Sequence, residues 1–156
     1  MSIAPVRKDI IVEATQARAF RVFTEEHGAW WPLATHHIGA KPAETAVIEP
    51  FEGGRWFERA ADGEICVWGK VRVWDPPGRV VLVWQIGANW KRDPDLMTEV
   101  EIKFVALGPA RTRVELEHRH LDLLGDAAEA MRAAFESDGG WLGMLKLFGA
   151  RAEQAA

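Results

Sequence analysis

The sequence has no tyrosine, a single cysteine and only two serines. One cysteine, Cys66, excludes an internal disulfide and agrees with a reducing cytoplasm, where we expect the protein to be located. The serines, Ser2 and Ser137, stand in no Gly-x-Ser-x-Gly turn, which excludes a serine hydrolase of that type. No Gly-x-x-x-x-Gly-Lys phosphate loop is present either. These absences remove several large enzyme classes.

Long apolar runs and basic clusters are also missing. No stretch approaches the ~18 apolar residues that a membrane helix needs, and residues 1–9 lack the apolar segment of a signal peptide. The formal net charge is −4, with lysine and arginine scattered among acidic residues. Nucleic-acid binding requires a basic patch. We therefore expect no nucleic-acid partner and no membrane insertion.

The size and balance of the chain are those of one globular domain. It has 156 residues, of which 48% are hydrophobic and 27% charged. A domain of this length buries roughly two-thirds of its unfolded surface, so it folds without a metal or a disulfide. We expect one domain over residues 1–156 and no cofactor.

Tryptophan is the residue that is abundant, with eight copies. Its side chain combines a large apolar face with one N–H donor. Eight such side chains predict either a heavily aromatic core or a pocket lined by aromatic rings.

Hydrophobic periodicity predicts a strand, two short helical pieces, six strands and a long final helix. The first strand is expected over residues 3–13, a helix over 14–24 with Thr15 as N-cap, and a second helical piece over 27–33. The strands that follow are expected over 45–50, 54–59, 65–74 and 79–86, with two more around 100–104 and 114–120. The final helix is expected from residue 126 to about 152, with an interruption at 137–140.

Clean alternation in the last two strands indicates an antiparallel sheet with one buried face. The apolar stripe of the final helix must pack on that face. The pattern predicts an α+β helix-grip fold, in which a curved antiparallel sheet of about seven strands wraps round the C-terminal helix. Such a sheet leaves room for a ligand cavity beside the helix.

Short motifs along nearly the whole chain resemble those of the START-like (SRPBCC) superfamily, and specifically its branch named after the activator of the Hsp-90 ATPase. The motifs are Trp30-Trp31-Pro32, Glu49-Pro50, Gly53-Gly54-Arg55, Asp62-Gly63, Gly69, Asp75-Pro76-Pro77, Val83-Trp84, the run from Glu115 to Arg119, and Gly140-Trp141. The resemblance implies the helix-grip fold. Because the superfamily includes lipid carriers, hormone receptors, aromatic polyketide cyclases, oxygenase subunits and chaperone cofactors, the fold alone does not identify a function.

Strand parity and helix position select the candidate ligand-binding residues. The strands predict Trp56, Trp84 and Phe104 on the concave face, with Glu58 and His118 as the polar groups among them. The helical segments that would cover this face supply Trp30, Trp31 and Trp141. The alternative is that all the aromatic residues are core.

The remaining candidates have simpler explanations. His118-x-His120 on one strand would turn both rings to one side, but no further metal ligand accompanies it, so we expect no metal site. His36-His37 is expected either as a solvent-exposed pair or as the polar rim of a pocket.

Three functions remain open at this point. The first is non-catalytic binding of a small apolar or aromatic molecule in the cavity. The second is a protein-interaction module of the chaperone-cofactor type, or a homodimer, that uses Trp68 and Trp74 on an outer face. The third is a cyclase or dehydratase that uses Glu58 or His118 as general base.

Overall fold

The computed structural model describes residues 3–154, and in them the predicted α+β order is confirmed. The seven strands are β1 (Val6–Val12), β2 (Ala43–Ile48), β3 (Arg55–Ala60), β4 (Ile65–Asp75), β5 (Arg79–Trp84), β6 (Thr98–Gly108) and β7 (Arg111–Arg119). They form one sheet in the order β1-β7-β6-β5-β4-β3-β2, and every neighbouring pair is antiparallel.

The helices are short, and all except the 3-10 helix, most of which precedes residue 126, lie along the chain where the periodicity predicts them. They are α1 (Gln16–Thr24), α2 (His27–Trp30), the 3-10 helix η1 (Leu121–Ala127), α3 (Ala128–Glu136) and α4 (Trp141–Ala152). Thr15 caps α1 as predicted, because its side chain accepts a hydrogen bond from the amide of Arg18. No helix within residues 3–154 combines the length and apolar character needed to span a bilayer.

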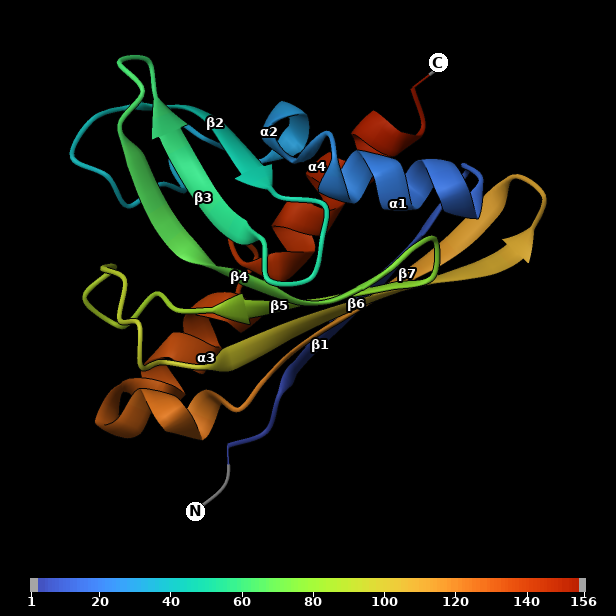
Figure 1. Ribbon diagram of the computed structural model, residues 1–156. Helices are drawn as coiled ribbons and strands as arrows, with labels where there is room; N and C mark the ends of the chain where they lie inside the picture. Colours follow the sequence, from blue (N-terminus) through green and yellow to red (C-terminus); the bar gives the residue numbers. More distant parts are fainter. Residues whose placement is uncertain (1–2, 155–156) are drawn as a thin grey trace.

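The C-terminal helical region is bent. Residues 137–140 separate α3 from α4, where the sequence predicts an interruption. Figure 1 shows the curled sheet beside α4, with α1 and α2 near one end of the molecule and α3 near the other. The helix-grip arrangement is therefore present, with its gripping helix in two main segments.

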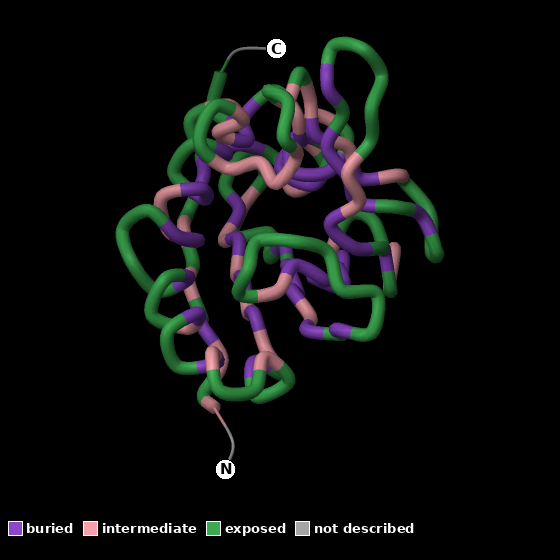
Figure 2. Tube along the Cα trace, turned by 90° about the vertical axis from the view of Figure 1, so that its left-hand side faces the viewer, coloured by how far each residue is buried: buried purple, intermediate pink, exposed green. Residues whose placement is uncertain are grey.

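The buried face of the sheet follows the predicted alternation in β6 and β7. Val100, Ile102 and Phe104 are at most 2% exposed, and they pair across the ladder with His118, Leu116 and Val114, which are equally buried. Figure 2 shows exposed residues concentrated in turns and loops at the periphery, with buried ones toward the interior. The concave face is thus continuous with the hydrophobic core.

The predicted outer-face position of Trp68 and Trp74 is wrong. Trp68 is 1% exposed and Trp74 packs against the core. The cause is two irregularities of β4: Trp68 is the extra residue between the pairs of β4 with β3, and Arg72 is the extra residue between its pairs with β5. A bulge adds one residue to one strand, and each extra residue reverses the side-chain parity beyond it.

Candidate functional site

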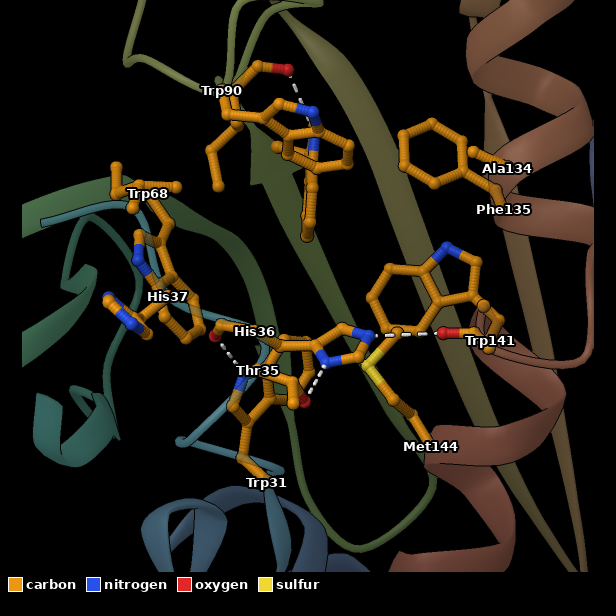
Figure 3. Close-up of a pocket in the computed structure, with 15 residues that line it drawn as sticks. Trp31, Thr35, His36, His37, Trp68, Trp90, Ala134, Phe135, Trp141 and Met144 are labelled. Atoms are coloured by element: carbon orange, nitrogen blue, oxygen red, sulfur yellow. Dashed lines mark hydrogen bonds between the residues drawn. The ribbon is translucent and has the colours of Figure 1, made fainter. Parts of the chain in front are cut away.

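A pocket of about 460 Å³ opens between the concave face of the sheet and the α3–α4 region. Five of the eight tryptophans line it: Trp31, Trp68, Trp84, Trp90 and Trp141. The other apolar lining residues are Ile38, Ile86, Ala134, Phe135 and Met144, and the polar side chains are Thr35, His36 and His37. In the view of Figure 3, Trp68 lies across the space from Phe135 and Trp141, and Trp90 and Trp31 lie at opposite ends.

Four of these indoles are fixed by their neighbours. The Trp31 and Trp68 rings lie 5.1 Å apart, and the Trp84 ring lies edge-on to Phe135 and Trp141 at 5.6 and 5.7 Å. Centroid separations of 4.5–7 Å with tilted planes are favourable aromatic contacts. The pocket wall is therefore preformed by rings that hold one another in place.

His118 lies behind this wall and makes a closed hydrogen-bond chain. Its Nδ1 accepts from the Trp141 indole N–H at 3.1 Å, since an indole nitrogen can only donate. Its Nε2 therefore carries the hydrogen and donates to Thr98 Oγ1, whose hydroxyl donates to the carbonyl of Trp84. Burial lowers the pKa of His118 to about 3, so the ring is neutral.

His27 forms a second pair of the same kind. Its Nε2 accepts from the Trp56 indole N–H at 3.1 Å, and its Nδ1 donates to the carbonyl of Phe23. Burial lowers the pKa of His27 to about 3, and the hydrogen bond to Phe23 opposes only part of that effect. Both histidines satisfy indole donors inside the core.

Glu58 is buried and ties the loop after α2 to the sheet. Its Oε1 accepts from the Trp68 indole N–H at 2.8 Å and from the Ile38 amide at 2.5 Å, and its Oε2 accepts from the Gly39 amide at 3.2 Å. These donors belong to the protein, so this carboxylate holds the loop in position. That loop carries the polar rim of the pocket.

The rim is closed on one side by His36. Its Nε2 lies 3.0 Å from the carbonyl of Gly139 in the α3–α4 turn, and its Nδ1 lies 2.7 Å from Thr35 Oγ1. Because a carbonyl only accepts, Nε2 donates to Gly139. By the same reasoning Nδ1 of His37 donates to the carbonyl of Gly39 at 3.1 Å.

The structure separates the eight predicted site residues into two groups. Trp31, Trp84 and Trp141 line the pocket. Trp30, Trp56, Glu58, Phe104 and His118 are buried in the layers that surround it. His118 and His120 do not share a side, because His120 ends the strand with φ 63° and its side chain is 53% exposed.

Sequence reasoning missed Trp68, Trp90, Phe135 and Met144 as lining residues. Trp68 was assigned to the outer face because the bulge in β4 could not be predicted. Phe135 and Met144 stand on apolar helix faces, where nothing in the sequence separates a core position from a pocket wall. Within residues 3–154, no group of three or more histidine, cysteine or acidic side chains is placed to hold a metal ion.

Solved structures with the same fold include two with substantial sequence identity. The anthrahydroquino-γ-pyrone synthase Txn09, solved as a complex, is 37% identical, with a TM-score of 0.66 and coverage of 96% of this chain and 97% of that chain. CalC from Micromonospora echinospora, described as a self-sacrificing resistance protein, is 32% identical, with a TM-score of 0.69 and coverage of 96% and 94%. Protein NE0264 from Nitrosomonas europaea shares the fold at 11% identity, with a TM-score of 0.68 and coverage of 97% and 95%.

No curated protein matched the sequence. The family model described as "Activator of Hsp90 ATPase homolog 1-like protein" matches residues 13–150, which is most of the chain. The helix-grip fold, the match over nearly the full length and the two similar structures agree, and the chain belongs to this family of START-like proteins.

Proposed function

We propose that the protein binds a small, flat aromatic molecule in the pocket between the sheet and the α3–α4 region, and that it does not catalyse a reaction of this molecule. The observation that carries the proposal is the lining: five tryptophans and Phe135 around a space of about 460 Å³, with polar side chains confined to the segment 35–37. Ligand sites are typically apolar cavities of ~300–1,000 Å³ with a few polar groups that orient the ligand. Aromatic walls favour a ligand that can stack on them.

The name of one similar structure supports this ligand class. The name of Txn09 describes a synthase of an anthrahydroquino-γ-pyrone, which is an aromatic polycycle, and CalC is described as a resistance protein. A polycycle of fused rings matches the flat faces of the indoles in this chain. We propose a ligand of the same chemical class.

The non-catalytic form of the proposal rests on the placement of the two expected general bases. Glu58 accepts three N–H donors from the protein, and both ring nitrogens of His118 are engaged in the core. Neither residue lines the pocket. A general base must lie within hydrogen-bond reach of the proton that it removes, so these two residues are poor candidates.

An enzyme of the cyclase or synthase type is the second candidate, and the 37% identity to a synthase favours it. Its proton-transfer group would be His37 rather than Glu58 or His118. His37 lines the pocket, and its Nε2 makes no hydrogen bond with residues 3–154.

The protein-interaction alternative required Trp68 and Trp74 on an outer face. Because both side chains pack in or against the core, the observation that suggested this alternative no longer holds.

A pair of substitutions on α3 tests the binding proposal. Ala134 lines the pocket and is exposed, while the neighbouring Ala133 is exposed but does not line it. Ala134→Trp should fill the mouth of the pocket and weaken binding of anthraquinone-2-sulfonate at least tenfold, measured by isothermal titration calorimetry. Ala133→Trp adds the same side chain to the same helix and should leave binding unchanged. Equal affinities in both variants would refute a ligand site in this pocket.

A further inference from the structure

Trp90 differs from the other tryptophans of the pocket in its backbone. It lies in the loop between β5 and β6, with φ 59°, in the left-handed region. Glycine and asparagine adopt that region readily, whereas a bulky side chain there is an outlier. The turn is closed by a hydrogen bond from the Trp90 amide to the carbonyl of Gly87 at 2.9 Å. The loop thus holds a large side chain at a position that would suit a small one.

The side chain of Trp90 is also the least engaged of the eight. Six indoles donate a hydrogen bond, and Trp74 packs edge-on to Phe20 at 5.1 Å. The Trp90 indole makes neither a hydrogen bond nor a ring contact with the described part of the chain. It is 49% exposed, although it forms part of the pocket wall.

The first feature costs stability in the free protein, and the second contributes little to it. A left-handed backbone at a residue other than glycine is strained, and sites of this kind cluster at ligand clamps. An exposed indole in addition leaves apolar area in water. Within residues 3–154 the Trp90 ring has no aromatic contact and no side-chain hydrogen bond that would account for its position, which points to a contact with a bound molecule.

We propose that Trp90 is a ligand-contacting residue, whose indole packs on the bound aromatic molecule and covers its solvent-facing side. This inference rests on the proposed function of the pocket and adds the residue that completes it. The other four pocket indoles supply fixed walls, and the β5–β6 loop supplies the remaining one (Figure 3). The ligand gives the Trp90 ring the aromatic contact that it lacks in the free protein.

Substitutions at Trp90 separate a ligand contact from a structural role. Trp90→Asn removes the ring and suits the left-handed backbone, so the midpoint of thermal unfolding should rise while affinity for anthraquinone-2-sulfonate falls about tenfold or more. Trp90→Phe keeps an aromatic ring and should retain most of the affinity. The matched control is His120→Asn, because His120 has φ 63°, is more than half exposed and lies outside the pocket. It should raise the melting midpoint without changing the affinity.

The outcomes separate the two proposals. If the wild-type protein binds the probe and Ala134→Trp abolishes binding, but Trp90→Asn binds as well as wild type, the Trp90 proposal is overturned and the pocket stands. A Trp90→Asn variant that melts at a lower temperature and also loses binding would show a structural role and overturn the proposal. If wild-type protein fails to bind the probe, the proposed function fails, and the Trp90 proposal fails with it.

Discussion

Two buried tryptophan–histidine pairs, Trp141–His118 and Trp56–His27, are the most distinctive residue-level feature of the core. In each pair an indole N–H points at the unprotonated ring nitrogen. A second proton on either ring would face that donor and remain far from water. Each histidine therefore accepts a hydrogen bond from an indole through its unprotonated nitrogen, and this arrangement in the core requires both rings to be neutral.

This dependence predicts a loss of stability in weak acid. An unfolded histidine titrates near pH 6.5, while both folded rings have a pKa of about 3. Between these values the unfolded chain binds protons that the folded chain does not. The contribution of the two neutral rings to folding stability is therefore complete above pH 6.5 and decreases as the pH falls toward 3. From pH 7.5 to 5.5 each ring should remove about 1.4 kcal/mol from the free energy of unfolding, measured by urea titration.

His118→Asn is the variant that assigns this pH dependence. The asparagine Oδ1 can take the place of Nδ1 as the acceptor for the Trp141 indole, but it does not titrate. The variant should lose stability overall, and its decrease between pH 7.5 and 5.5 should be about half that of wild type. An unchanged slope in His118→Asn would contradict the assignment.

At the scale of elements, the sequence predicted the extent of β4 well but not the faces of its side chains, whereas the buried-face positions that it predicted in β5, β6 and β7 are correct. The ladder of β5 with β6 has no register shift, and that of β6 with β7 has one only beyond Ala106, so side chains such as Trp84 and His118 fall on the expected face. In β4 the extra residues reverse the parity, and a single sequence does not show where a ladder gains a residue. The position of Trp90 in the pocket wall could not be predicted either, because it depends on a loop conformation and not on periodicity.

The loop that carries the pocket rim depends on one carboxylate, and Glu58→Gln tests this dependence. A glutamine amide has one oxygen and one NH₂ group, whereas Glu58 accepts hydrogen bonds through both of its oxygens. In the variant the NH₂ group would therefore face an N–H donor of the indole or of the backbone. We expect a loss of about 1–3 kcal/mol in the free energy of unfolding. We also expect faster hydrogen exchange at the amides of Ile38 and Gly39.

A control for this change is available on the neighbouring strand. Glu44 on β2 is exposed and its side chain makes no hydrogen bond within residues 3–154. Glu44→Gln should therefore leave both the stability and the exchange rates as they are. If Glu58→Gln behaves in the same way, the loop is held by other contacts.

On the scale of the whole molecule, elements from the beginning of the described chain contact those near its end. β1 pairs with β7, and α4 ends beside the start of α1. The Arg18 guanidinium on α1 donates to the carbonyls of Ala152, Arg151 and Gln154, and the Glu13 amide donates to Glu153. These carbonyls stand at the end of α4, where a helix leaves acceptors without partners inside the helix. The N-terminal third of the chain and the last helix are thus parts of one structure.

These contacts predict that the chain unfolds as one cooperative domain. Tryptophan fluorescence reports the aromatic core, and far-UV circular dichroism reports the helices, so both should show the same urea midpoint. Arg18→Met keeps the apolar stem but removes the donors to α4, and should lower both midpoints together by an amount equivalent to about 1–2 kcal/mol. Arg21→Met changes an exposed arginine on the same helix, which makes no side-chain hydrogen bond with residues 3–154, and should leave them unchanged. If Arg18→Met shifts the dichroism midpoint alone, α4 unfolds separately and the single-domain prediction is wrong.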